Sequence, residues 1–313
     1  AVKSAVLLPK GKVTAQQLSQ PLGAGAAVFE LPGVFDDCMK VVERLSENYE
    51  VALLNSKNPW RVLGQESYAY EVAQQFDYDL GDIVLFVPVG NAGNITAILS
   101  GLMKFHIIGI IDRLPKVVAV QSERANPVYL YYQKPRDNRA FAAVNVRPSV
   151  AQAAMIGNPV SFPRLSKFAR DYEEAAGGSS FFVVEVQEQD IMESMLLANR
   201  RGLPICTQGG ECLAGLKKAL KLGLVAPSEV AVLDSTAHAL KFIDFQNSYF
   251  NGALENEYGI TAKEDLTNRV RSLSLGGVPV PSEKALSPQE RDIFVKAAAS
   301  EIAAALELTQ KPK

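Results

Sequence analysis

The sequence predicts an α/β protein with open, mostly parallel sheets that are flanked by helices and divided between two lobes. Short apolar runs of strand length alternate with helix-periodic segments along most of the chain. Several runs end in turns rich in Gly and small polar residues, as the carboxyl ends of parallel strands do. The chain has 313 residues, 48% of them hydrophobic and 21% charged, which is enough for two sizeable cores.

The first part of the chain has the pattern of a small βαβαβ unit. Apolar runs predict strands, and periodic segments predict the helices between them: strands at residues 4–8, 26–30 and 51–55, helices at residues 16–23 and 36–48. In the second helix Phe35, Met39, Val42 and Leu45 share one face. We expect residues 1–58 to form the remainder of a small βαβ lobe.

A larger α/β lobe is expected over residues 59–248. Its predicted strands lie at residues 83–89, 117–121, 181–186 and 229–233, and its predicted helices at residues 65–76, 95–103, 188–200 and 211–222. The strands should pair in parallel because helices intervene between them. Beyond about residue 250 the chain becomes richer in Gly, Pro and Ser, so residues 249–313 are expected to be a linker and a helical tail with a helix at 288–308.

The most informative turn is Gly90-Asn91-Ala92-Gly93-Asn94, which joins the strand at 83–89 to the helix at 95–103. A helix start has unpaired N–H groups and partial positive charge, and glycine lets a phosphate approach the backbone closely. The turn therefore predicts a phosphate-binding loop. The alternative is a tight turn with no ligand, which an isolated Gly-x-x-Gly favours.

A second candidate site follows the predicted strand at 51–55. Asn55, Ser56 and Arg61 place amide, hydroxyl and guanidinium donors together, and Arg is suited to bidentate recognition of phosphate or carboxylate. We expect a second anion to bind there. The alternative is that the amides satisfy the backbone of a turn while Arg61 pairs with a surface acid.

A third candidate is the run from Asp234 to His238 after the strand at 229–233. The hydroxyl of Thr236 can donate to or accept from a heterocyclic nitrogen without carrying charge. The alternative is that Ser235 or Thr236 caps a short helix.

Composition excludes several function classes. The net charge is −2 and no Lys/Arg block occurs, so neither nucleic acid nor a membrane surface is an expected partner. Cys38, Cys206 and Cys212 have no Cys-x-x-Cys spacing, and the chain has only two histidines, so we expect no disulfide framework and no metal site. A reducing, cytoplasmic location is expected. The apolar runs are too short to cross a bilayer.

In this order, the motifs resemble those of the threonine synthase family, which are fold-type II pyridoxal phosphate enzymes of the tryptophan synthase β-like fold. The branch that includes the plant enzymes is the most similar. The resemblance runs from the first residue to about Phe242 and rests on these segments: residues 8–12, 35–40, 55–65, 88–94, 112–115, 126–130, 156–161 and 235–242.

The resemblance implies a cofactor, a substrate and a role for each candidate residue. Gly90, Asn91, Ala92, Gly93 and Asn94 would hold the phosphate of pyridoxal 5'-phosphate, and Thr236 would face its pyridine nitrogen. Asn55, Ser56 and Arg61 would hold the phosphate of O-phospho-L-homoserine, a small phosphorylated amino acid. The family eliminates that phosphate and adds water to give L-threonine. A homodimer is also implied.

The chain departs from the family pattern in two ways. The family's Schiff-base lysine lies in a Ser-Phe-Lys-Asp-like motif upstream of the matching region, and we expect no catalytic lysine within this chain. The chain is therefore expected to be the C-terminal portion of a longer protein or a degenerate relative, and to be inactive alone. The second departure is the segment from Cys206 to Glu211, which differs from the family's usual motifs. We expect Cys206 to be a buried, inert thiol.

Three hypotheses follow from these observations. The first is threonine synthase activity. The second is another fold-type II enzyme, such as a threonine dehydratase or a cysteate synthase; the dehydratase substrate has no phosphate, so Asn55 and Arg61 weigh against it. The third is a non-catalytic relative that keeps the fold without the lysine.

Overall fold

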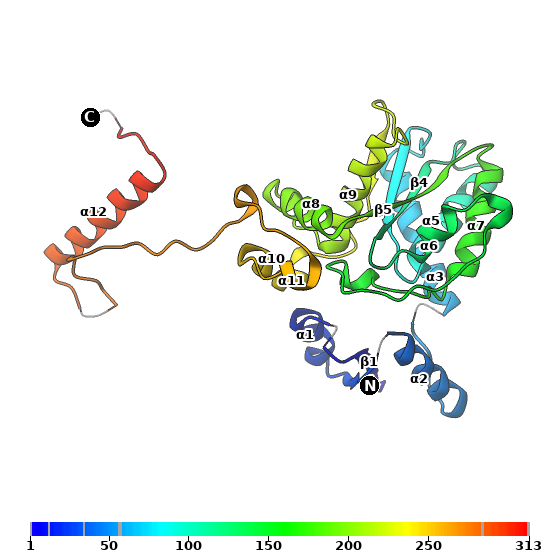
Figure 1. Cartoon of the computed structure of the whole chain (residues 1–313), viewed down its shortest axis with the longest axis horizontal. Coiled ribbons are helices and arrows are strands. Elements are labelled where there is room, and N and C mark those ends of the chain that lie inside the picture. Colours follow the sequence, from blue (N-terminus) through cyan, green and yellow to red (C-terminus); the bar gives the residue numbers. More distant parts are fainter. Residues whose placement is uncertain (1, 12, 34, 56–57, 283–284, 312–313) are drawn as a thin grey trace. The chain divides into compact units, whose positions relative to one another are not determined.

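The structure is a computed structural model that describes residues 2–11, 13–33, 35–55, 58–282 and 285–311. The chain divides into two compact units, residues 1–267 and residues 268–313 (Figure 1). The first unit contains both sheets and every candidate site residue that the structure describes. The second contains one long helix.

The small lobe is built on a two-stranded parallel sheet. Strand β1 (Ala5–Pro9) pairs with β2 (Ala27–Leu31), and the connecting helix α1 (Ala15–Gly23) begins with a capping box at Thr14. Helix α2 (Phe35–Asn48) follows. The third predicted strand, at 51–55, is wrong: the described residues there form no strand, and Val51 and Leu54 are 49% and 80% exposed. An apolar run that finds no neighbouring strand does not become one.

The large lobe contains a four-stranded sheet with every pair parallel. Its order is β5-β4-β3-β6, where β3 is Ile83–Pro88, β4 is Lys116–Ser122, β5 is Phe181–Val186 and β6 is Val230–Leu233. Every residue of β3 is buried, as expected for a central strand with helices on both faces. The predicted large-lobe strands are confirmed to within three residues at each end.

Alternate residues of β3 belong to two different cores. Leu85 and Val87 face a core that includes residues of α4 (Ser67–Gln75), α5 (Gly93–Ile107) and α7 (Phe162–Ala175). Val84 and Phe86 face the other core, which includes residues of α8 (Glu188–Arg200), α9 (Thr207–Lys221) and α10 (Ile243–Phe250). In Figure 1, α5 and α7 lie on one side of the sheet, and α8 and α9 lie on the other. The two-residue period of a strand produces this division.

Several helices differ from their predicted bounds. The helix expected at 65–76 is α4, which begins two residues later than predicted, and it is preceded by α3 (Pro59–Gln65). Helix α7 was not predicted. Helix α9 begins at Thr207, earlier than the predicted residue 211, because Cys206 acts as its N-cap and Sγ accepts from Gly209 N at 3.4 Å. The sequence did not predict this earlier start because two consecutive glycines, Gly209 and Gly210, are unfavourable in a helix.

Short elements complete the first unit. They are α6 (Pro127–Tyr132), η1 (Arg136–Asn138), η2 (Gln152–Ala154), η3 (Ala239–Phe242), α11 (Glu255–Tyr258) and η4 (Glu264–Leu266). The second unit contains α12 (Pro288–Ala305), whose start is fixed by a capping box between Ser287 and Glu290. Within that unit Ser274 N donates to Glu301 Oε1 at 2.9 Å.

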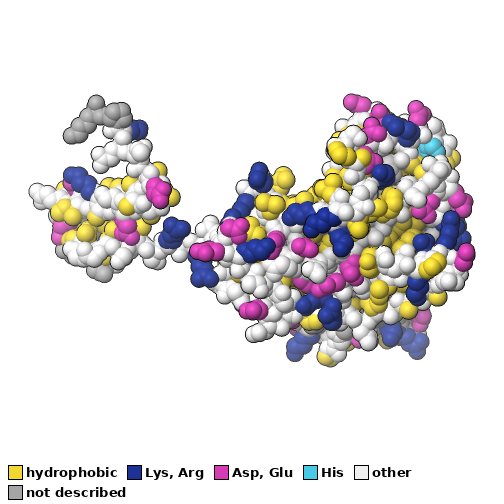
Figure 2. Space-filling model, turned by 45° about the horizontal axis from the view of Figure 1, so that its top comes forward, with side chains coloured by type: hydrophobic (Ala, Val, Ile, Leu, Met, Phe, Trp, Pro, Cys, Tyr) yellow, Lys and Arg dark blue, Asp and Glu magenta, His cyan; other side chains and the backbone are white. Residues whose placement is uncertain are grey.

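The visible surface of the larger unit carries charges of both signs. Figure 2 shows Lys and Arg side chains interspersed with Asp and Glu over this face, in keeping with the net charge of −2. No helix in the described part of the chain is both long and apolar enough to span a bilayer.

Candidate active site

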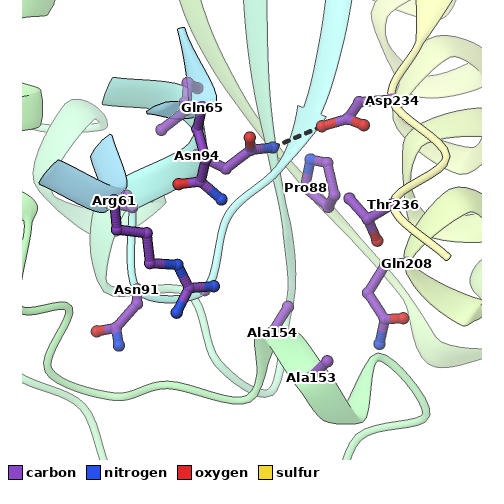
Figure 3. Close-up of a pocket in the computed structure, with 14 residues that line it drawn as sticks. Arg61, Gln65, Pro88, Asn91, Asn94, Ala153, Ala154, Gln208, Asp234 and Thr236 are labelled. Atoms are coloured by element: carbon purple, nitrogen blue, oxygen red, sulfur yellow. Dashed lines mark hydrogen bonds between the residues drawn. The ribbon is translucent and has the colours of Figure 1, made fainter. Parts of the chain in front are cut away.

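A cavity of about 430 Å³ lies where β3 and β6 end, at the carboxyl edge of the large sheet (Figure 3). Open α/β sheets bind their ligands at this edge. The cavity is lined by the loop between β3 and α5 together with residues from α3, η2, α9 and the segment after β6: Arg61, Gln65, Pro88, Gly90, Asn91, Ala92, Gly93, Asn94, Ile95, Ala153, Ala154, Gln208, Asp234 and Thr236. All five predicted loop residues are therefore at the cavity.

The backbone of this loop requires a glycine at its start. A Cβ on Gly90 would lie 2.9 Å from Ala154 Cα and 3.3 Å from Ala153 O, so the loop could not approach η2 with a larger residue there. Ala92, the N-cap of α5, has φ 62°, a left-handed conformation that costs a non-glycine residue about 1–2 kcal/mol. Such strain is concentrated at functional sites. The loop is thus held in a conformation that local sequence preferences do not explain.

Hydrogen bonds hold the loop in place from three sides. Asn91 Oδ1 accepts from Val160 N at 3.0 Å, and Asn91 O accepts from Ser161 N at 3.2 Å. Thr96 Oγ1 donates to Ala92 O at 2.6 Å, and Gln121 Nε2 donates to Val89 O at 3.0 Å. The first N–H groups of α5 have no intrahelical acceptor and lie at the cavity, where the helix dipole adds positive potential.

Asp234 is a site residue to which the sequence analysis gave no role. It follows β6 directly, is 6% exposed, and accepts a hydrogen bond from Asn94 Nδ2 at 2.6 Å. Burial raises the pKa of its carboxyl to about 6, although the Asn94 hydrogen bond acts in the opposite direction. The signal that could have identified it is its position in the same strand-ending turn as Thr236.

Arg61 reaches the same cavity from α3. The helix starts there because Asn58 Oδ1 accepts from Trp60 N at 2.9 Å and Pro59 occupies its first turn. Figure 3 shows the guanidinium directed toward the space between Asn91 and Gln208. Among the described residues no acid pairs with Arg61, which weighs against the interpretation as a surface ion pair. The same residue also lines an adjacent cavity of about 420 Å³.

Asn55, which was predicted to share the second site with Arg61, is not among the residues that line the cavity. Asn55 is outside the lining of both cavities, and its Nδ2 lies 3.3 Å from Met39 Sδ. Ser56 lies outside the described residues. The structure therefore brings Arg61, and not Asn55, next to the loop.

Thr236 lies at the cavity, and it is not a helix cap. The cap of η3 is His238, whose Nδ1 accepts from Leu240 N at 3.1 Å. Thr236 Oγ1 lies 3.7 Å from Cys206 Sγ, at the start of α9. Cys206 is fully buried, which agrees with the prediction of a buried thiol.

Gln208, in the first turn of α9, also lines the cavity, and the sequence analysis did not assign it a role.

Comparison with known proteins identifies the family. Residues 2–235 match the family described as pyridoxal-phosphate dependent enzyme, which is well over half of the chain. The chain belongs to this family. Its cofactor is therefore pyridoxal phosphate, as the resemblance implied.

Curated members of this family that are similar to the chain are named threonine synthases. The chain is 38% identical to threonine synthase of Methanocaldococcus jannaschii over 242 residues, covering 76% of this chain and 57% of that protein. It is 35% identical to threonine synthase 2, chloroplastic, of Arabidopsis thaliana, covering 79% of this chain and 46% of that protein. The chain thus spans about half the length of the curated relatives it matches.

Solved structures confirm the fold class. A crystal structure of threonine synthase from Escherichia coli matches with a TM-score of 0.63 and 21% identity, over 84% of this chain and 57% of that one. A serine racemase from Dictyostelium discoideum matches with a TM-score of 0.53 and 18% identity, over 75% of this chain and 68% of that one. The fold-type II architecture expected from the resemblance is therefore confirmed.

The described residues of the cavity fit pyridoxal phosphate. Gly90 packs against the backbone of Ala153 and Ala154, so the loop keeps a fixed position at the cavity. The backbone N–H groups at the start of α5 can surround an anion there. Thr236 offers a neutral hydroxyl, and Gln208 a buried amide, on the far side from Arg61 (Figure 3). No group of three metal-binding side chains was found in the described part of the chain.

Proposed function

We propose that the whole protein converts O-phospho-L-homoserine and water to L-threonine and phosphate, as a threonine synthase. The single observation that carries the proposal is that one cavity is lined by both the Gly90–Asn94 loop and the guanidinium of Arg61, which has no ion-pair partner among the described residues. A cofactor and a substrate that each carry a phosphate need two such anion-binding groups side by side. Relatives that match most of this chain are named threonine synthases, which supports the same reaction.

In this proposal the backbone of residues 90–94 binds the ester phosphate of the cofactor. Pyridoxal phosphate, when bound, supplies an electron sink for carbanions formed on the amino-acid substrate. Because Asn91 is held by Val160 and Ser161, the loop fixes the cofactor phosphate without rearranging. Thr236 is proposed to face the ring nitrogen with a neutral hydroxyl, which leaves that nitrogen uncharged.

Arg61 is proposed to bind the phosphate of the substrate. A guanidinium offers a fork of donors that matches two phosphate oxygens, and its charge is permanent over the working pH range. By holding the leaving phosphate at a fixed distance from the loop, Arg61 would orient the reacting carbon over the cofactor. Asn55 and Ser56 are proposed to join Arg61 when substrate is bound.

The remaining expectations belong to the same proposal. No lysine is among the described residues that line the cavity, and the proposal assigns the Schiff-base lysine to no residue of this chain. A homodimer and a cytoplasmic location are proposed by analogy with the family resemblance. The chain covers only about half of its relatives, so the activity is proposed for the whole protein.

The test is phosphate release by the native-length protein supplied with pyridoxal phosphate. With O-phospho-L-homoserine, threonine and inorganic phosphate should form in equal amounts. O-phospho-L-serine with sulfite is the comparison, because release of phosphate from that pair alone would indicate a cysteate synthase instead. If neither substrate released phosphate although the cofactor bound, the proposal of a phosphorylated amino-acid substrate would be wrong.

A further inference from the structure

Gln208 is a buried side chain whose polar atoms have no partner within the described protein. It lies in the first turn of α9 and is only 3% exposed. Both Nε2 and Oε1 are buried, and neither makes a hydrogen bond to any described residue. The same side chain lines the cavity that contains the Gly90–Asn94 loop. Buried side-chain amides nearly always make hydrogen bonds, so a ligand or an ordered water is expected to bond to Nε2 and Oε1 of Gln208.

Close packing fixes the position of Gln208 in the fold. A Cβ on Gly209 would lie 2.9 Å from Ile205 Cβ and 3.2 Å from Ser235 Oγ. A Cβ on Gly210 would lie 2.6 Å from Ile191 O, in α8. The two glycines therefore let the first turn of α9 lie against both α8 and the segment after β6. This is a physical reason for a Gly-Gly pair inside a helix, where glycine is otherwise unfavourable.

That packing places Gln208 on the same side of the cavity as Thr236. Thr236 Oγ1 lies 3.7 Å from Cys206 Sγ, the N-cap of α9. In Figure 3 Gln208 and Thr236 lie together on the side of the cavity opposite Arg61 and Asn91. Gln208 and Thr236 therefore line one side of the cavity together, and both are uncharged.

The chemistry of the amide indicates what it contacts. A glutamine side chain is uncharged and carries two N–H donors and a carbonyl acceptor, so it suits a polar atom on the edge of a neutral heteroaromatic ring. It offers no charge to attract a second anion, unlike Arg61. The backbone N–H groups that could bind a phosphate at this cavity belong to the start of α5.

We infer that Gln208 would bind the ring of the cofactor, donating or accepting a hydrogen bond at a polar ring atom, while the N–H groups at the start of α5 would hold the phosphate. The inference rests on the pyridoxal phosphate site of the proposed function and does not depend on the substrate.

The experiment compares a ligand that has the ring with one that lacks it. Isothermal titration calorimetry measures binding of pyridoxamine 5'-phosphate, which cannot react with lysines, and of inorganic phosphate. In Gln208→Met, which keeps the length of the side chain but removes the amide, pyridoxamine phosphate should bind about 3- to 10-fold more weakly, the effect of one neutral hydrogen bond. Inorganic phosphate should bind with unchanged affinity. The melting temperature of the unliganded variant should not fall, because an unpaired buried amide is removed.

Gln75→Met is the matched control. Gln75 is exposed on α4 and is not among the residues lining the cavity, so both affinities should stay at the wild-type values. Gln208→Ala is the second variant, and it should reproduce the selective loss of ring binding. If both Gln208 variants also lost phosphate binding, the residue would be structural and the inference wrong.

Two further outcomes separate this inference from the proposed function. If the wild-type chain bound pyridoxamine phosphate and Gln208→Met bound it equally well, the inference alone would be overturned. If the wild-type chain bound inorganic phosphate but not pyridoxamine phosphate, the cavity would not accept the ring, and both proposals would fall.

Discussion

Asn94 Nδ2 donates a 2.6 Å hydrogen bond to Asp234 Oδ2, which joins the first turn of α5 to the end of β6 beside the phosphate-binding loop (Figure 3). The bond places a carboxyl at a helix start whose dipole favours negative charge. The surroundings are nevertheless poorly solvated, and burial raises the pKa of Asp234 to about 6. Burial and then the charge of Asp234 raise the pKa of Tyr68 in α4 and of Cys212 in α9, and Cys212 Sγ donates to Asp234 O at 3.6 Å.

Asp234→Asn should reduce the pH dependence of stability. Folding raises the pKa of this carboxyl, so the stability it contributes is present below the unfolded-state value near 3.8 and is lost as the pH rises through about 6. The amide introduced here still accepts from Asn94 but does not titrate. We expect the free energy of unfolding, measured by urea denaturation, to decrease between pH 4.5 and pH 7.5 in the wild type. In the variant this decrease should be smaller by roughly 1–2 kcal/mol. An identical pH dependence in both proteins would contradict the account.

Glu211→Gln should stabilise the protein at neutral pH. Glu211 is fully buried, and burial followed by the charge of Glu188 raises its pKa well above the usual value, although the backbone of Ser122 acts in the opposite direction. Neither carboxyl oxygen meets the geometric criterion for a hydrogen bond within the described residues. Keeping a proton on this carboxyl at pH 7 opposes folding, and that cost grows as the pH rises. The variant should gain at least about 1 kcal/mol at pH 7, measured by urea denaturation, with a smaller gain at pH 5.

Glu229→Gln is a control of opposite sign. Burial raises the pKa of Glu229, but Ala226 N and Lys116 outweigh it, and the net shift is downward. Glu229 Oε1 lies 2.8 Å from Lys116 Nζ, so the charged form contributes stability above pH 4.5 that is lost on acidification. This variant should be less stable than the wild type at pH 7. A gain in stability from both substitutions would indicate a general effect of charge removal.

Gly90→Ala should weaken phosphate binding. The added methyl would lie 2.9 Å from Ala154 Cα, so either η2 or the loop must shift. Calorimetric titration should show the affinity for inorganic phosphate lowered about 10-fold or more, because the N–H groups no longer converge. Gly93→Val, in the same loop, should also reduce cofactor retention.

Gly64→Ala serves as the comparison for this loop variant. Gly64 lies in α3, and no heavy atom of a non-neighbouring residue lies within 4 Å of the position that a Cβ would take, so the alanine should fit without a clash. It should leave phosphate affinity unchanged and add about 0.5–1 kcal/mol of stability. Equal loss of phosphate affinity in both glycine variants would show that the loop has no special role.

Arg61→Ala should mainly raise KM for the phosphorylated substrate in the native-length protein. Arg61 is exposed, so its removal should leave the melting temperature nearly unchanged. Loss of a charge-assisted pair should raise KM about 10- to 100-fold with a smaller effect on kcat, measured from initial rates of phosphate release. Arg61→Lys should recover part of the loss, because it restores charge but not the planar fork. Unaltered kinetics would place the second anion site elsewhere.

Much of the large lobe could be predicted from the sequence because periodicity and local turn chemistry determine it. The strands from 83 to 233 were found, and the predicted Gly90–Asn94 turn follows β3 as expected, although its last two residues already belong to α5. The strand at 51–55 was wrong because an apolar run needs a partner strand, which no local pattern reveals. Helix α7 was missed although residues 162–175 pack one face against the core.

The site residues that were missed depend on tertiary packing. Asp234 and Gln208 each lie in a turn rich in small polar residues, where a polar side chain is most easily interpreted as a cap. Their position at the cavity depends on the packing of α5, α9 and the end of β6 against one another, which the local sequence does not indicate. Arg61 was recognised because its donor geometry suits an anion, whereas Asn55 contacts Met39 and is not among the residues that line the cavity.

A crystal structure of the native-length protein with pyridoxal phosphate bound would test the assignment of the phosphate-binding loop most directly. The account predicts the ester phosphate within hydrogen-bonding distance of backbone N–H groups of residues 90–94, with the ring extending toward Thr236 and Gln208. A phosphate bound away from this loop, or a ring on the Arg61 side of the cavity, would contradict it.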